Sequence, residues 1–306
     1  MIEIEQKCNT LLNVLSVWVR SNGLLLNLKK TNYMVFTRQR TTQELNLLID
    51  NKPIKRMTEA KFLGVIVDDR LAWTSHVKAL KAKMSRYVGI MYKIKRHIPL
   101  EVRLQIYNSF VQCHVNYCCL VWGFSSKSNI ESIFSRQKKG IRAVMPGYIQ
   151  YYFKDGTLPS GTKSSFTKYK ILTIHNIIAK NALIFMHKIS TFPKLLPQSL
   201  KDTIPGNVPN TIVSDDTFEE HSDWIEKFGS QVYRNTLFYK GPLLQIDSKF
   251  NEIRSPSACL SMKIFKNNVT NSLLKYQSSG EKDEWLANNF VLYNINGLRR
   301  SARING

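Results

Sequence analysis

Apolar residues between positions 77 and 94 recur every three or four positions, and this spacing predicts an amphipathic helix. They are Val77, Leu80, Met84, Tyr87, Val88, Met91 and Ile94. Six basic residues fall on the other side of the predicted helix: Lys78, Lys81, Lys83, Arg86, Lys93 and Arg96. No acid occurs between Arg70 and Leu100, so i,i+4 ion pairs cannot neutralise this face. Such a face is either simply solvated or binds a polyanion, and its lack of acids favours binding.

Two more helices are predicted after this one. Residues 100–121 are apolar nearly all round, as in a central helix of a bundle, whereas residues 129–144 have a mixed surface. Thr74 or Ser75 can cap the first helix, and His97-Ile98-Pro99 ends it. The short connections between the three predict a compact helical bundle over residues 74–145.

Before Trp73 the pattern is that of one helix on a small, largely antiparallel sheet. The helix covers Ile4 to Val19 and ends at Asn22-Gly23, where either residue can adopt a left-handed conformation. The predicted strands are 24–28, 33–37, 45–49, 53–57 and 60–67, with a turn at residues 50–52.

The remainder of the chain is less regular. We expect a linker over residues 146–165, a helix over 166–189, a proline-rich loop over 191–216 and a short helix over 261–274. The predicted domains are 1–73, 74–145 and 166–306, the last one mainly helical. The fold class is therefore α+β.

Charge adds to the prediction of a polyanionic partner. The chain has 306 residues with 44 Lys+Arg and 22 Asp+Glu, and residues 1–150 carry 24 of the basic and 9 of the acidic side chains. Five irregularly spaced cysteines argue against a disulfide framework, and no signal peptide or membrane-spanning stretch is visible. We expect an intracellular protein, cytoplasmic or nuclear.

Several short blocks resemble one protein family. They are Trp18, Gly23-Leu24-Leu25-Leu26-Asn27, Lys30-Thr31, Met34 and Phe36, then Phe62-Leu63-Gly64-Val65, Leu71, Trp73 and His76, then Tyr117 and Val121-Trp122-Gly123. In this order they resemble the end of the palm and the thumb of non-LTR retrotransposon reverse transcriptases, jockey-like or related. Weaker matches follow at Arg234-Asn235, Phe238–Pro242, Phe265-Lys266, Leu273-Leu274 and Gly297–Arg299, and these resemble the C-terminal region of such proteins.

The resemblance implies roles for residues outside the basic helix. Lys30 would be a cation near the pyrophosphate of the incoming nucleotide, whereas locally it is one of two lysines in a surface turn. Phe62, Leu63 and Gly64 would form a primer-grip-like hairpin, with Gly64 allowing close approach of the primer terminus. The alternative is a core strand whose glycine relieves packing. The thumb-like helix would follow the phosphates of an RNA or DNA template-primer.

No metal site is expected in this chain. Asp68-Asp69 superficially resembles a metal-binding Asp-Asp turn, but its position predicts turn residues and charges at a helix start. Cys113, His114, Cys118 and Cys119 lie on an apolar helix and lack the usual paired spacing of zinc ligands. We expect Mg²⁺ only in the complete polymerase.

The resemblance starts after the family's catalytic aspartates, so we expect a truncated protein that binds nucleic acid but is inactive alone. Three alternatives stay open. The chain is a fragment of a complete RNA-directed DNA polymerase mis-started at Met1, a domesticated helical scaffold for a protein partner, or a decayed product with an aggregating strand edge. The oligomeric state is not predicted.

Overall fold

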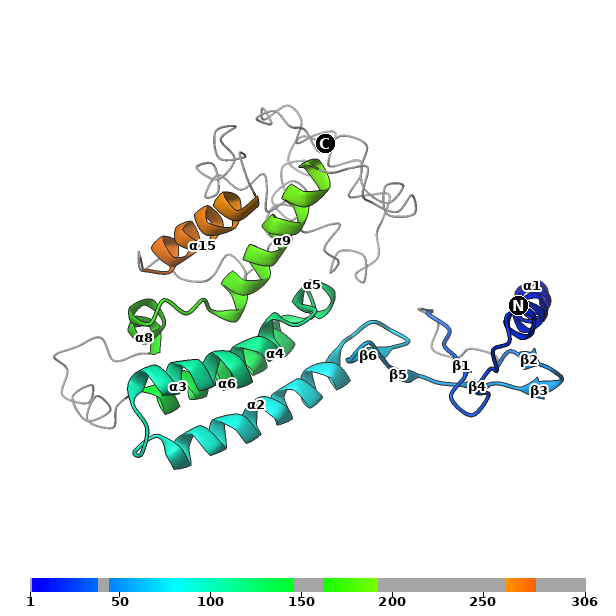
Figure 1. Cartoon of the computed structure of the whole chain (residues 1–306), viewed down its shortest axis with the longest axis horizontal. Helices are drawn as coiled ribbons and strands as arrows, with labels where there is room; N and C mark the ends of the chain where they lie inside the picture. Colours follow the sequence, from blue (N-terminus) through cyan, green and yellow to red (C-terminus); the bar gives the residue numbers. More distant parts are fainter. Residues whose placement is uncertain (1, 38–43, 146–161, 192–261, 279–306) are drawn as a thin grey trace, which may run out of the picture. The chain divides into compact units, whose positions relative to one another are not determined.

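The computed structural model describes residues 2–37, 44–145, 162–191 and 262–278 (Figure 1). The chain divides into two units, residues 1–76 and 77–306. Within the described ranges, no helix combines the length and the apolar character that crossing a bilayer requires. The predicted loop at 191–216 and the tail blocks at 234–242 and 297–299 lie outside the described residues, apart from Thr191 itself.

The first unit contains one long helix packed on short strands. Helix α1 (Ile2–Ser21) ends where predicted, and Gly23 has a φ of +69°. Cys8 and Leu12 of α1 pack on a small core, which is formed by Leu45, Leu47, Ile49 and Ile54. Burial of this one side of α1 is what attaches the helix to the strands.

The strands of this unit are shorter than predicted. They are β1 (Asn32–Tyr33), β2 (Leu48–Ile49), β3 (Lys52–Pro53), β4 (Lys55–Arg56), β5 (Glu59–Phe62) and β6 (Val65–Asp68). The pairs β2–β3 and β5–β6 are antiparallel, and β1–β4 is parallel. The hairpin around residues 50–52 is confirmed, with Asp50 and Asn51 both at positive φ as a tight hairpin turn requires.

Two strand predictions were wrong. Residues 24–28 form no strand in the described structure, because a turn at Asn27–Lys30 redirects the backbone, with the Lys30 and Thr31 N–H groups donating to the Asn27 carbonyl. The predicted single strand 60–67 is the hairpin β5–β6. Leu63 (φ 44°) and Gly64 (φ 84°) form its two-residue turn, which the unbroken apolar run concealed.

The helical unit is built around the predicted bundle. Helix α2 (Thr74–Ile94) buries Val77, Leu80, Met84, Val88 and Met91, which confirms the apolar stripe. Helix α6 (Lys127–Val144) also matches its prediction, and the side chain of Ser126 caps it by accepting from the Asn129 N–H.

The predicted continuous helix 100–121 is interrupted twice. It consists of α3 (Leu100–Tyr107), a π-helical turn η1 (Asn108–Gln112), α4 (Cys113–Asn116) and α5 (Cys119–Trp122). Tyr117 is extended and Cys118 is left-handed (φ 49°) at the second break. The Trp122 indole N–H donates to the Tyr117 carbonyl at 3.0 Å, so the break is held by a buried side chain rather than by a local sequence signal.

The chain after residue 161 joins the same helical unit. Helix α8 (Thr162–Lys168) begins inside the range predicted as a linker, and α9 (Ile174–Thr191) follows a break at Lys170 (φ 52°), so the predicted single helix 166–189 is two helices. Helix α9 packs on α5 and α6, and α15 (Met262–Ser278) packs on α9 and α8 (Figure 1). The helix predicted at 261–274 is thus confirmed and extends further.

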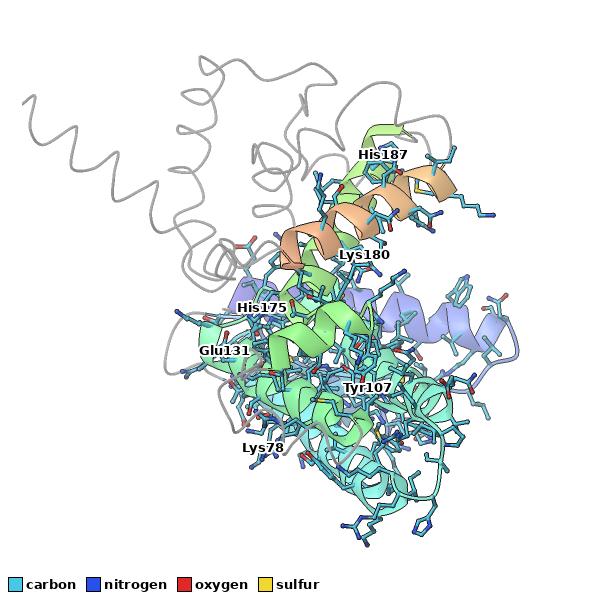
Figure 2. The ribbon with its side chains drawn as sticks, turned by 90° about the vertical axis from the view of Figure 1, so that its left-hand side faces the viewer. Lys78, Tyr107, Glu131, His175, Lys180 and His187 are labelled. Atoms are coloured by element: carbon cyan, nitrogen blue, oxygen red, sulfur yellow. The ribbon has the colours of Figure 1, made fainter. Side chains whose placement is uncertain are left out.

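Close approach of the bundle helices depends on one glycine. A Cβ atom on Gly140 of α6 would lie 2.9 Å from the Tyr107 ring and 3.5 Å from a Val88 methyl group. Tyr107 is fully buried among the helices (Figure 2). Gly140 therefore allows α2 and α3 to pack against α6.

Candidate nucleic-acid interface

The predicted basic residues lie on the solvent side of α2, except Arg96, which follows the last residue of the helix. Lys78, Lys83, Arg86, Lys93 and Arg96 are exposed and Lys81 is half-buried. Lys78 lies at the outside of the bundle in Figure 2. None of the six forms an ion pair with an acid in the part of the chain that the structure describes. The structure therefore places the predicted cations together on one uncompensated face, from here on the basic face.

More positive charge surrounds the C-terminal end of α2. The ammonium of Lys95 lies 5.2 Å from the centre of the Tyr92 ring. Burial, together with the nearby cations Arg103 and Arg96, holds the pKa of Lys95 below its ordinary value. Arg103 is buried, and its guanidinium donates to the Met145 carbonyl at 3.4 Å. The cations here repel one another, so an anion bound at this end would relieve that repulsion.

Phe62, Leu63 and Gly64 form the tip of the β5–β6 hairpin. The side chains of Phe62 and Leu63 are 67% and 74% exposed. The alternative of a core strand is therefore wrong, because these residues form an exposed turn in which Gly64 supplies a positive φ. The primer-grip role of this tip stays a prediction.

Lys30 lies in an exposed surface turn, as its local sequence suggested. Its backbone N–H donates to the Asn27 carbonyl at 3.0 Å. The pyrophosphate-side role that the family resemblance implies for Lys30 stays a prediction.

Asp68 organises the connection from β6 to α2. One of its carboxylate oxygens accepts from the Arg70 and Ala72 N–H groups at 3.2 and 2.9 Å, and the other accepts from the Trp73 N–H at 2.8 Å. Trp73 has a positive φ of 64°, so this cap holds a strained backbone just before the helix. Asp68 is thus a turn residue at the helix start, as predicted from its position.

The cysteines and histidine between positions 113 and 119 do not converge. Cys113 is exposed and its thiol lies against the Ser109 carbonyl, whereas Cys119 is buried and accepts from the Asn181 amide at 3.2 Å. Burial raises the pKa of the Cys119 thiol to about 11. Among the described residues, no group of three or more His, Cys, Asp or Glu side chains is arranged to hold a metal ion.

Two features of the helical unit were not predicted from the sequence. The first is an aromatic cluster of Tyr87, Phe110 and His114, in which the Tyr87 ring lies 5.1 Å from Phe110 and 5.5 Å from His114. The second is a hydrogen bond between Glu131 Oε1 and Nε2 of the buried His175, 3.2 Å apart (Figure 2). Both features join side chains from helices that are far apart in the sequence, so spacing within one helix does not reveal them. The one available signal was the four-residue spacing of Phe110 and His114 in the aromatic cluster.

Two curated proteins of Drosophila melanogaster are similar to this chain. One is described as the probable RNA-directed DNA polymerase from transposon X-element, and it is 24% identical over 193 residues, 62% of this chain and 20% of that protein. The other carries the same description for transposon BS, and it is 27% identical over 155 residues, 48% of this chain and 16% of that protein. The chain thus spans about a fifth of the length of these relatives. No protein-family model and no solved structure matches it.

Proposed function

We propose that this chain, which contains a region related to the RNA-directed DNA polymerases of non-LTR transposons, binds the phosphate backbone of an RNA or DNA template-primer through the basic face of α2. The observation that carries the proposal is the uncompensated charge of that face: five cations and no acid on α2, with Arg96 just after its end. Attraction between such a face and phosphates releases counterions and does not depend on base sequence.

The dimensions of the basic face suit a nucleic-acid backbone. Lys78 and Lys93 are separated by about 22 Å along a helix that rises about 1.5 Å per residue. That length corresponds to about seven base pairs of a duplex at about 3.4 Å each. The apolar side of α2 is meanwhile fixed in the bundle through Met84 and Met91, so the cations are presented from a rigid helix.

Within a complete polymerase, we assign the first unit to the end of the palm and the helical unit to the thumb. The exposed tip of the β5–β6 hairpin supports a primer-grip-like role, because an exposed glycine turn can approach another backbone closely. Asp68 and Asp69 do not fit the Mg²⁺ that a complete polymerase holds, because three backbone N–H groups hold the carboxylate of Asp68 and no third possible ligand among the described His, Cys, Asp and Glu residues joins the pair. We therefore propose binding without primer extension for this chain alone.

Fluorescence anisotropy of a labelled primer-template duplex tests the binding proposal. We expect salt-sensitive binding, with log Kd changing linearly with log salt concentration. The triple variant K78Q/R86Q/K93Q should reduce the slope by about 2 to 3, since each phosphate contact contributes about 0.9. The matched control K263Q/K266Q/K275Q removes the same charge from α15. Equal effects of both triples, or no binding by the wild type, would overturn the proposal.

Primer extension tests the second part. The purified chain, incubated with primer-template, nucleotides and Mg²⁺, should bind the duplex and leave the primer at its original length. Extension above that of a heat-denatured sample would contradict the proposal.

One observation favours protein binding as a second function. Helix α1 leaves a stripe of apolar side chains exposed at helical spacing: Ile4, Leu11, Leu15 and Trp18. A scaffold of this kind would show no salt-sensitive retention of the duplex. It would also associate through a surface that the substitution Leu11→Asp disrupts.

A further inference from the structure

We propose that the aromatic cluster of Tyr87, Phe110 and His114 stacks on an unpaired base of the bound nucleic acid, so that the protein selects a duplex with a single-stranded extension. This inference rests on the proposed function, because the basic face of α2 is what holds the strand. Tyr87 belongs to the same helix as that face.

The three rings already form a partial stack. Tyr87 and Phe110 are tilted by 35° with centroids 5.1 Å apart, and Tyr87 and His114 are nearly parallel, at 24° and 5.5 Å. These separations are typical of interacting aromatic rings. Tyr87 and His114 are half-buried, whereas Phe110 is 46% exposed. Tyr87 and His114 are therefore held in place by packing, and Phe110 presents ring surface to solvent.

The π-helical turn explains why Phe110 points outward. Tyr107 and Val111 on either side of it are completely buried, and Phe110 lies between them in η1 (Asn108–Gln112). A π-helical turn inserts one extra residue into a helix, which changes the direction of side chains, and such turns are frequent at functional sites. A large apolar ring is thereby exposed beside the buried Tyr107 and Val111.

The charge beside the cluster favours a nucleic-acid occupant. Lys83 lies one turn before Tyr87 on α2 and is close enough to His114 to help burial lower the pKa of that imidazole. The cluster is therefore an aromatic surface with the exposed cation Lys83 beside it. Single-stranded nucleic acid matches both parts, because its bases offer flat faces and its phosphates pair with cations.

The occupant is unpaired rather than duplex nucleic acid. Bases inside a duplex already stack on their neighbours, so their faces are not available to a protein ring. The faces of bases in a single-stranded extension are available, and any of the bases can stack on an aromatic side chain. The expected ligand is therefore the unpaired template strand next to a bound duplex.

Binding of two matched ligands tests this inference: a blunt duplex, and the same duplex with a single-stranded extension containing 2-aminopurine. We expect the wild type to bind the extended duplex about tenfold more tightly and to quench the 2-aminopurine fluorescence. Phe110→Ala and Phe110→Leu should lose both effects, whereas Phe110→Trp should keep them. Because Leu retains the apolar character of Phe, the Leu and Trp variants separate stacking from simple apolar contact.

Controls separate this inference from the proposed function. Ile264→Ala removes an apolar side chain of similar exposure from α15 and should change neither affinity. Thermal unfolding should show that the Phe110 variants fold, since the ring is only partly buried. Salt-sensitive binding of the blunt duplex without any gain from the extension would overturn the stacking proposal alone, as would full retention of the gain by Phe110→Leu. Failure to bind either ligand would overturn both proposals.

Discussion

Gln137 of α6 and Gln277 of α15 bind the same short stretch of backbone between α8 and α9. Gln137 donates to the Leu172 carbonyl at 2.9 Å and accepts from the Ile174 N–H at 2.8 Å. Gln277 donates to the Ile171 carbonyl at 3.0 Å and accepts from the Thr173 N–H at 3.1 Å. Both side chains are almost completely buried. Four backbone groups that cannot reach water are thus satisfied by two amides.

Gln137→Leu should lower the free energy of unfolding by about 1 to 3 kcal/mol, because it removes the acceptor of the buried Ile174 N–H and leaves the Leu172 carbonyl with only the longer bond from the Gln112 amide, at 3.5 Å. Gln105→Leu is the matched control, since Gln105 is exposed on α3. Urea denaturation followed by circular dichroism measures both variants. An effect of Gln137→Leu no larger than that of Gln105→Leu would contradict the importance of this network.

Gly140→Ala and Gly89→Ala should have opposite effects on stability. The new methyl group at position 140 lies 2.9 Å from the buried Tyr107 ring, so we expect a loss of about 1 to 3 kcal/mol. At position 89 of α2 nothing lies within 4 Å, and the better helix propensity of alanine should add up to about 1 kcal/mol. Thermal unfolding of the two variants checks the sign of each change. A stabilised Gly140→Ala variant would show that the helices are not in close contact there.

Asp68→Ala should loosen the segment between β6 and α2. The substitution removes the acceptor of the Arg70, Ala72 and Trp73 N–H groups, at a cost of about 1 to 3 kcal/mol. Amide hydrogen exchange at these three residues should become faster, whereas Asp69→Ala should leave it almost unchanged. Equal exchange in the two variants would contradict the capping role of Asp68.

Stability should depend on pH through Glu131. The hydrogen bond from His175, followed by its Coulombic attraction, holds the pKa of Glu131 below its ordinary value of 4.5, against the opposing effect of burial. A depressed pKa stabilises the fold above pH 4.5, and this stabilisation is lost as pH falls through the folded-state value. The urea midpoints of wild type and Glu131→Gln should differ at pH 6. They should converge as the pH falls toward about 3 and Glu131 becomes protonated. Glu101→Gln, at an exposed position, should show no such convergence.

Periodic elements could be predicted from the sequence, and interruptions could not. Helices α1 and α2 were predicted because one apolar stripe recurs along each of them, and α6 was predicted as a helix with a mixed surface. The break at Cys118 was missed because no glycine or proline marks it, and the Trp122 indole that holds it acts through the folded structure. The β5–β6 turn was missed because Leu63-Gly64 lacks the Asn-Gly signature of such turns.

The candidate site also has one part that could be predicted from the sequence and one part that could not. The basic face was predictable because five of its six residues belong to α2, and helical spacing determines which of them share a side. The aromatic cluster was not, because the contact of Tyr87 with Phe110 depends on how α2 lies against the π-helical turn. Side chains brought together by packing between helices cannot be paired from spacing within one helix.

The bonds of Gln277 also have a consequence for folding during synthesis. Its partner Thr173 precedes it by 104 positions in the chain. Until the ribosome has released Gln277, the segment before α9 cannot acquire its final hydrogen bonds, however early α2 and α6 have formed. Completion of the helical unit therefore waits for the synthesis of α15, and nascent chains paused before this glutamine should still be open to protease at residues 171–173.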